Sequence, residues 1–181
     1  MKKLTFFFAL VLLISSSSFA QQGLFSLGVN GGVMVPMGDF GDAYKVSPAI
    51  GLEAVYQITP EIDIVANAVY NILSSKYTYT NTTIYYIEGT AAARYNFVKD
   101  KGVFFGEAGI GMYDFSTKYT LLGTEYSSSS SDFGINLGVG GKYPIDKNLD
   151  LIGKIRFHNI FTKGTSTNYI SLGAGINYNF R

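Results

Sequence analysis

Hydrophobic and polar residues alternate without a break over residues 169–180, at the end of the chain. The even positions carry Ile, Leu, Ala, Ile, Tyr and Phe, and the odd positions from 171 to 179 carry Ser, Gly, Gly, Asn and Asn. Because successive side chains of a β-strand point to opposite faces, this pattern predicts a strand with one apolar face and one polar or small face. Helical spacing would instead place Gly173 and Asn177 on one face with Ile170, which argues against an amphipathic helix.

Seven earlier segments show the same two-residue period. With the last segment they predict eight strands, at residues 25–35, 49–58, 62–73, 83–97, 103–115, 132–143, 149–158 and 169–180. The phase of the fifth strand is the least defined, because Val103 and Phe105 add apolar residues to the face opposite Phe104. We assign Phe104 and Ile110 to its apolar face.

The connections between these segments alternate in length. The short ones contain Pro, Asp, Gly, Lys and Asn, which favour tight turns, and they are residues 59–61, 98–102 and 146–148. The long ones are residues 36–48, 74–82, 116–131 and 162–167. The third long connection contains the serine run at residues 127–131, and we expect that run to be mobile. An even number of strands with short turns at one end predicts an all-β, eight-stranded antiparallel up-and-down barrel, with both termini at the short-turn end.

The first 20 residues have the features of a secretory signal peptide. Lys2 and Lys3 precede an apolar stretch over residues 4–14, and small residues then lead to Ala20. We expect cleavage after Ala20, which leaves residues 21–181 as the barrel domain. The apolar stretch is shorter than the roughly 20 residues that a transmembrane helix needs.

The apolar faces could point inward, as in a soluble ligand-binding barrel, or outward, as in a membrane barrel. An eight-stranded barrel has an interior just wide enough for side chains, and it cannot hold the apolar faces of all its strands. The other face is rich in Gly, Ser and Asn and has few Lys, unlike a surface in water. The aromatic residues of the apolar face also gather at strand ends, which is typical of the interfacial girdles of a membrane barrel. We therefore predict a transmembrane β-barrel with its apolar face outward.

Two aromatic girdles follow from this assignment. The girdle at the turn end consists of Phe25, Tyr56, Tyr95, Phe97, Phe104, Tyr143, Tyr178 and Phe180. The girdle at the loop end consists of Tyr70, Tyr85, Phe133 and Phe157. Closure of the barrel is also expected, because an unpaired backbone N–H or C=O in hydrocarbon costs several kcal/mol and an open sheet edge is not tolerated.

These features resemble the small eight-stranded outer-membrane barrels of the OmpA/OmpX type and the broad family of outer membrane protein beta-barrel domains. The resemblance rests on the signal peptide, the eight alternating segments and the closing strand that ends Tyr178-Asn179-Phe180. It implies a location in the outer membrane of a Gram-negative-type bacterium, with extracellular loops and periplasmic termini. It also implies that the barrel-insertion machinery reads the closing strand, in which Phe180 is followed here by Arg181.

Charged residues of both signs fall on the predicted inward faces. They are Glu53, Asp63, Glu88, Glu107, Arg94, Lys142, Lys154 and Arg156. Charges in a narrow interior must be paired and hydrogen-bonded, so we expect a structural charge network that plugs the lumen. A small porin-like channel is an alternative, although aqueous channels appear in barrels of about 16 strands.

His158, the only histidine, also faces inward near the loop end. Because Cys is absent, nucleophilic catalysis would need a Ser together with His158 and a carboxylate. Outer-membrane lipid A deacylases are eight-stranded barrels with a Ser two residues after a His, and this chain has Ile160 there. A lipid A-modifying enzyme is therefore the weaker alternative to a non-enzymatic protein. One His without Cys does not indicate a transition-metal site, and we expect no catalytic residue and no cofactor.

The composition limits the partners of the chain. Without the signal peptide it has 12 basic and 13 acidic residues, a balance that does not favour nucleic acid. The long connections and strand extensions contain tyrosines among Ser and Thr, namely Tyr44, Tyr77, Tyr79, Tyr119 and Tyr126. Such residues suit an adaptable contact surface, although Tyr also suits strands that continue beyond the membrane. We expect a monomer in outer-membrane lipid that has a structural role or contacts a surface ligand through its loops.

Overall fold

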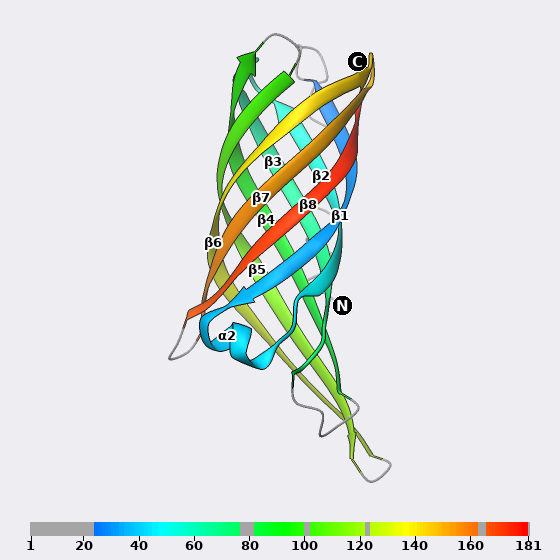
Figure 1. The fold of residues 1–181 in the computed structure, drawn as a ribbon, viewed down its shortest axis with the longest axis vertical. Helices are drawn as coiled ribbons and strands as arrows, with labels where there is room; N and C mark the ends of the chain where they lie inside the picture. Colours follow the sequence, from blue (N-terminus) through cyan, green and yellow to red (C-terminus); the bar gives the residue numbers. More distant parts are fainter. Residues whose placement is uncertain (1–23, 77–81, 100–101, 122–123, 163–165, 181) are drawn as a thin grey trace, which may run out of the picture.

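Antiparallel strands wind around one axis and close into a barrel (Figure 1). The computed structural model describes residues 24–76, 82–99, 102–121, 124–162 and 166–180. Within these residues eight strands pair in chain order, and the last strand pairs with the first. The strands are β1 (Phe25–Met37), β2 (Ser47–Gln57), β3 (Ile62–Leu73), β4 (Thr82–Lys99), β5 (Gly102–Leu121), β6 (Thr124–Asp146), β7 (Leu149–Phe161) and β8 (Ser166–Phe180). The prediction of an eight-stranded up-and-down barrel is confirmed.

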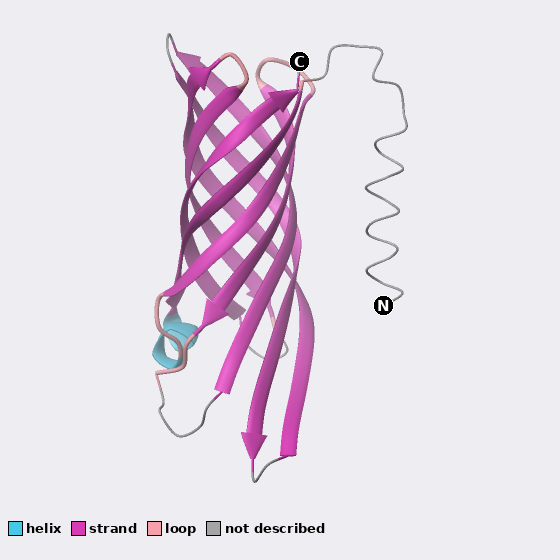
Figure 2. Cartoon of the chain, turned by 90° about the vertical axis from the view of Figure 1, so that its right-hand side faces the viewer, coloured by secondary structure: helices cyan, strands magenta, loops and turns pink. Residues whose placement is uncertain are grey.

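Closure joins the first and last strands along the length of β1. Phe25 pairs with Phe180, and the same register continues to Met37 opposite Asn168. The start of β1 and the end of β8 therefore lie together at the end with the short turns, as predicted, and the long connections lie at the other end (Figures 1 and 2). The predicted signal peptide lies outside the described residues. Among the described residues no helix is long and apolar enough to cross a membrane.

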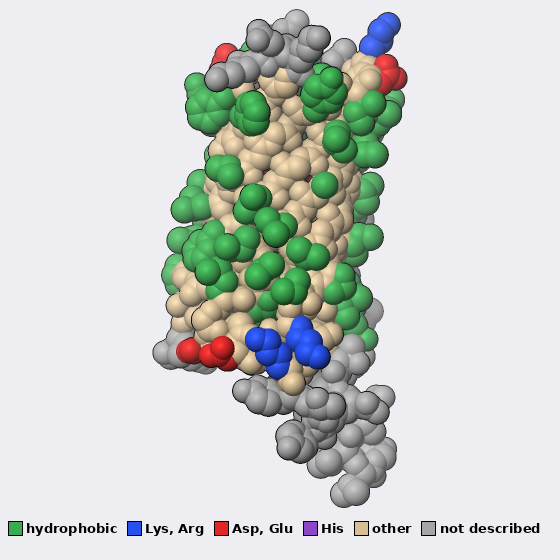
Figure 3. Space-filling model, in the orientation of Figure 1, with side chains coloured by type: hydrophobic (Ala, Val, Ile, Leu, Met, Phe, Trp, Pro, Cys, Tyr) green, Lys and Arg blue, Asp and Glu red, His purple; other side chains and the backbone are tan. Residues whose placement is uncertain are grey.

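Hydrophobic side chains cover the outside of the barrel wall. Leu52 of β2 is 61% exposed, whereas the next residue, Glu53, is 1% exposed and faces inward. In β7, Ile155 is likewise exposed and Arg156 is buried. Figure 3 shows hydrophobic side chains along the wall, with the charged side chains of this view confined to the two ends of the barrel. The predicted outward apolar face is confirmed.

The phase of β5 follows from two neighbouring phenylalanines. Phe104 is 64% exposed on the outer wall, and Phe105 is 2% exposed inside the barrel. The centre of the Phe105 ring lies 4.1 Å from the guanidinium carbon of Arg94. This cation–π contact gives the inward-facing ring a specific partner. The assignment of Phe104 and Ile110 to the apolar face is confirmed.

The prediction of a long connection over residues 116–131 is wrong, because β5 and β6 continue through most of it. Their pairing runs through Ser116 opposite Ser129 and Lys118 opposite Ser127. The hairpin projects beyond the loop end of the barrel (Figures 1 and 2). A serine run has no apolar alternation to indicate a strand, yet its backbone groups can pair with a neighbouring strand like any others.

A short helix, α2 (Gly38–Ala43), occupies the first long connection, where the sequence indicated only a loop. Gly38 has a φ of +58°, a left-handed conformation that favours glycine, and it follows directly on β1. The helix lies at the loop end of the barrel (Figure 2), and the chain that follows it forms an isolated antiparallel bridge between Tyr44 and Ser75. A helix of 6 residues is too short for its period to be recognised in the sequence.

Candidate functional site in the barrel interior

Arg94 of β4 joins two carboxylates inside the barrel. The strand register places Glu107 of β5 directly opposite Arg94, and Glu53 reaches the same guanidinium group from β2. Arg94 Nη2 lies 2.9 Å from Glu107 Oε2 and 3.0 Å from Glu53 Oε2. Arg94 Nε also donates to Glu107 Oε2, at 3.0 Å. All three residues are buried, so these charges attract each other in a medium of low dielectric constant.

Glu53 has further partners besides Arg94. Lys154 of β7 forms an ion pair with it, and Asn177 of β8 donates to its Oε1 at 3.0 Å. Lys154 also donates to Asn67 Oδ1, at 2.8 Å. We call Glu53, Arg94, Lys154, Asn67 and Asn177 the Glu53 cluster. It ties β2 to β4, β7 and β8, none of which pairs with β2.

A second group of charges surrounds Glu88. Arg156 Nη2 lies 3.0 Å from Glu88 Oε1, and its Nη1 donates to Thr90 at 3.3 Å. Tyr169 donates its hydroxyl to Glu88 Oε2. We call Glu88, Arg156, Tyr169 and His158 the Glu88 cluster. Its link to the Glu53 cluster is Glu107, whose Oε1 lies 3.8 Å from Arg156 Nε.

The last of the predicted inward charges form a separate pair. Lys142 Nζ donates to Asp63 Oδ2 at 3.2 Å. Asp63 is 1% exposed, whereas the Lys142 side chain is partly exposed. The structure thus brings each predicted inward charge within reach of an opposite charge. A buried charge is tolerated when it is paired and hydrogen-bonded in this way.

Three tyrosines that the sequence analysis did not single out fill the interior toward the loop end. Tyr86, Tyr113 and Tyr169 are each 0% exposed, and they pack with Met34 and other buried apolar residues. The Tyr86 and Tyr169 rings meet edge to face at 5.7 Å between centroids. The alternation does place these positions on the inward face, so the available signal was an aromatic residue at an inward position of each of three strands.

The helix α2 and its neighbours cover this aromatic group. Phe40 and Tyr44 pack against it, and their ring centroids are 5.0 Å apart. Phe115 of β5 contacts Phe40 at 5.8 Å and Tyr86 at 4.4 Å between ring centroids. Side chains of the first long connection therefore pack directly onto the interior at the loop end.

His158 has hydrogen-bonding neighbours that resemble part of a nucleophilic catalytic site. Its Nδ1 lies 3.0 Å from the Tyr113 hydroxyl, and its Nε2 lies 3.2 Å from Ser171 Oγ. Its ring stacks on Tyr169 at 4.2 Å between centroids. Glu88 Oε2 is 3.8 Å from Nδ1, beyond hydrogen-bond distance. A serine next to a histidine is one part of a nucleophilic site, but the carboxylate contact that would orient the histidine is made by tyrosine instead.

A nucleophilic Ser171 would also need space for a substrate beside it. His158 is 0% exposed, and the hollow beside Ser171 has a volume of about 20 Å³. A hollow of that size holds about one water molecule and no lipid substrate. Among the described residues, no group of three or more His, Cys, Asp or Glu side chains is placed to hold a metal ion.

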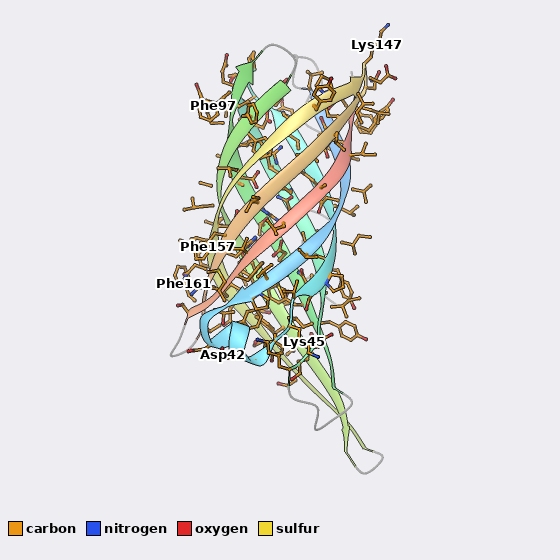
Figure 4. The ribbon with its side chains drawn as sticks, in the orientation of Figure 1. Asp42, Lys45, Phe97, Lys147, Phe157 and Phe161 are labelled. Carbon is orange, nitrogen blue, oxygen red and sulfur yellow. The ribbon has the colours of Figure 1, made fainter. Side chains whose placement is uncertain are left out.

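The predicted girdle residues lie on the outer wall toward its two ends. At the turn end the rings of Phe25 and Phe180 are 5.8 Å apart, and those of Tyr178 and Phe180 are 4.9 Å apart. At the loop end the rings of Tyr70 and Tyr85 stack at 5.7 Å. Figure 4 shows Phe97 and Phe157 on the wall at different heights. Their role as interfacial anchors remains a prediction.

One further aromatic residue belongs to the loop end of the wall. Phe161 is 52% exposed, and its ring stacks on that of Phe133 at 6.3 Å between centroids. The predicted seventh strand ended at residue 158, so Phe161 fell outside it. The strand in fact continues to Phe161, opposite Phe133 of β6.

The outer wall also carries a shallow apolar groove. It has a volume of about 720 Å³, and its floor includes the small residues Ala93, Gly106 and Ala108. A Cβ atom at Gly106 would meet no other atom within 4 Å, so this glycine faces open space outside the barrel. Arg94 and Glu107 also border the groove, but they are buried and pair with each other inside the barrel. The groove is therefore part of the apolar wall.

A closed strand ladder, an apolar outer wall and paired charges inside define a transmembrane β-barrel protein. The chain belongs to the outer membrane protein beta-barrel domain family, whose model matches residues 6–180. The outer membrane is accordingly its location, and lipid is its surroundings.

Solved structures of other small outer-membrane barrels are similar to this chain. Neisserial surface protein A has a TM-score of 0.70 at 18% identity, and the match covers 88% of this chain and 100% of that one. Ail, the attachment invasion locus protein of Yersinia pestis, has a TM-score of 0.61 at 15% identity, with the same coverage. OprG from Pseudomonas aeruginosa has a TM-score of 0.59 at 13% identity, with 89% and 97% covered. At these identities the likeness concerns the fold. No curated protein matches the sequence.

Proposed function

We propose that this chain is a non-enzymatic outer-membrane protein that contacts a partner outside the cell through the hairpin of β5 and β6. The observation that carries the proposal is the free edge of that hairpin. In the described register, pairing of β6 with β7 begins at Phe133 opposite Phe161. Residues 124–132 of β6 lie beyond that point and pair with β5 on their other side.

A free strand edge presents backbone N–H and C=O groups that a further strand can pair with. Proteins commonly protect such an edge with Lys, Pro or a bulge, and residues 124–132 contain neither Lys nor Pro. The described side chains Ser128 to Ser131 are exposed and small, so they leave the backbone accessible. The chemistry of this surface suits a partner segment in extended conformation, which would add one strand to the sheet.

The similar barrels support an external contact role. Ail is described as an attachment invasion locus protein, and it has also been solved with the heparin analogue sucrose octasulfate. In this chain, the contact surface that we propose is the strand edge. The tyrosines predicted for this role divide between regions: Tyr44 packs toward the barrel interior, Tyr77 and Tyr79 lie outside the described residues, and Tyr119 pairs with Tyr126 in the hairpin.

The proposal includes a lumen that is plugged rather than conducting. The Glu53 and Glu88 clusters span the interior with buried charges. Toward the loop end, the interior is filled by Tyr86, Tyr113 and Tyr169 and covered by α2 and its neighbours. It also includes insertion as a monomer, with the closing strand read by the insertion machinery and the loop end facing outward.

Site-specific photo-cross-linking in living cells tests the contact role. A photoreactive amino acid at Ser129, on the free edge, should give adducts with proteins. The matched control at Val139 of the same strand, which is 61% exposed on the outer wall, should give adducts with lipid. An absence of protein adducts at Ser129, or the same protein adducts at both positions, would contradict the proposed contact surface.

A further inference from the structure

A small hollow lies inside the barrel between the Glu53 and Glu88 clusters. Its volume is about 20 Å³. Polar residues from five strands line it, namely Asn30, Asn71, Glu88, Lys154, Arg156 and Ser171. A hollow of roughly 10–15 Å³ or more can hold one water molecule when it offers two to four polar partners. We propose that one long-lived water molecule binds here and bridges the two clusters.

The surrounding groups offer both donors and acceptors. The Lys154 ammonium has three N–H donors, and the structure assigns two of them to Glu53 and Asn67. Asn71 donates through Nδ2 to the backbone oxygen of Tyr86 at 3.4 Å, so its Oδ1 serves as an acceptor. The Ser171 hydroxyl contacts His158 and can make a further hydrogen bond. A water molecule can therefore accept from Lys154 and donate to Asn71 or Ser171.

The charges around the hollow favour water over an ion. Lys154 and Arg156 lie two residues apart on the inward face of β7, so their positive charges both border the hollow. A metal cation would be repelled by them. Glu88 on the opposite side would repel an anion, and halide ions are also larger than water. A neutral molecule with two donors and two acceptors is the ligand that fits both the size and the charge.

Glycines on β1 and β8 create this space. Gly32 and Gly173 face each other in the register of the two strands. A Cβ atom at Gly32 would lie 2.0 Å from the backbone oxygen of Leu172, so only glycine allows this close approach. A Cβ atom at Gly173 would meet only the backbone oxygen of Gly31, at an ordinary contact distance of 3.6 Å. Gly173→Ala therefore fits the barrel without a clash and adds a methyl group at the hollow.

Gly173→Ala is compared with the wild type and with a matched control, Gly153→Ala. Gly153 is also in a strand, but a Cβ atom there would point into open space outside the barrel. Each protein is refolded in detergent micelles, and its backbone spectrum shows whether the barrel has formed. Rotating-frame NMR spectra then record contacts between water and the side-chain amide protons of Asn71, and separate them from proton exchange by sign. High-resolution crystals of the wild type and of Gly173→Ala provide a second readout.

We expect a water cross-peak to Asn71 in the wild type and in Gly153→Ala, and its loss in Gly173→Ala. The wild-type crystals should show one ordered water within hydrogen-bond distance of at least two of Asn71, Lys154 and Ser171. Crystals of Gly173→Ala should show none at that position. A folded wild type without the cross-peak or the density would overturn the proposal, and so would a Gly173→Ala protein that retains either signal.

Discussion

Arg94 and Glu107 stand directly opposite each other on β4 and β5, and the guanidinium nitrogen lies 2.9 Å from the carboxylate oxygen. Glu53 meets the same nitrogen from β2, at 3.0 Å. The first contact joins neighbouring strands, whereas the second joins strands that do not pair. A shift of one residue in the β4–β5 register would turn one of the two partners onto the lipid face, so the pair also opposes an incorrect register.

Loss of the arginine should strongly destabilise the barrel. Arg94→Met removes the positive charge and leaves Glu53 and Glu107 buried without it. Breaking a buried ion pair costs about 3–5 kcal/mol, because the remaining charge stays desolvated. We expect a reduction of this size in the free energy of unfolding, measured by urea titration of the refolded protein in detergent micelles.

A second substitution should partly restore that stability. Glu107→Gln in the Arg94→Met protein removes a charge whose remaining cation, Arg156, lies 3.8 Å away, while Glu53 keeps Lys154 and Asn177 as partners. The double variant should therefore unfold at a higher urea concentration than Arg94→Met alone. Lys147→Met, at an exposed turn (Figure 4), is the control and should leave the midpoint unchanged. If Arg94→Met behaved like this control, the buried network would contribute nothing to stability.

A charge on the outer wall should impair insertion into a bilayer. Ala91 of β4 is exposed on the wall, whereas its neighbour Ala92 is buried against Val55 and Val65. An arginine near the middle of a membrane barrel costs about 2–4 kcal/mol. Ala91→Arg should therefore fold less completely into lipid vesicles, as measured by the shift of the folded band in unheated gels.

The control for this variant introduces the same side chain where water surrounds it. Ser129 pairs with Ser116 in the hairpin of β5 and β6, and this hairpin projects beyond the loop end of the barrel (Figure 1). Ser129→Arg should fold into vesicles as completely as the wild type. Equal folding of Ala91→Arg and Ser129→Arg would show that residue 91 does not face hydrocarbon.

The purified protein should not form a large open pore. An eight-stranded barrel has an interior that side chains fill, and here buried ion pairs and three buried tyrosines occupy it. Planar-bilayer recordings at saturating protein should therefore lack the stable, large conductance steps of a 16-stranded porin measured in parallel. Reproducible open-pore steps from the monomer would favour the small-channel alternative.

The alternation of apolar and polar residues predicted the architecture, because the outer wall of a membrane barrel requires an apolar residue at every second position. Every outward position that meets hydrocarbon must be apolar, so the two-residue period of β8 and its partners survives in the sequence. The same parity assigned Glu53, Arg94 and Arg156 to the interior. The two-residue period does not tell which charges meet, because Glu53 and Arg94 belong to strands that are not paired. Their contact depends on the curvature of the closed barrel.

The wrong predictions from the sequence concern the loop end of the barrel, where the chain leaves the hydrocarbon of the membrane. Ser129 and its neighbours extend a strand into water, where no apolar face is required and the alternation disappears. Gly38 begins a helix too short to show a period. Phe161 was omitted because the predicted strand stopped at the last clear alternation, three residues early. The tyrosines of the interior were recognisable only as inward positions, since packing between strands determines that Tyr86, Tyr113 and Tyr169 meet.

The loop end should face outside the cell and the short turns should face the periplasm. The chain contains no Cys, so a single introduced thiol can be labelled without interference. Ser129→Cys, exposed on the hairpin, should react with a membrane-impermeant maleimide on intact cells. Lys147→Cys, exposed at the turn between β6 and β7, should react only after the outer membrane is permeabilised. Equal labelling of both variants in a denaturing buffer establishes that each thiol is reactive, and the opposite pattern on intact cells would reverse the assigned orientation.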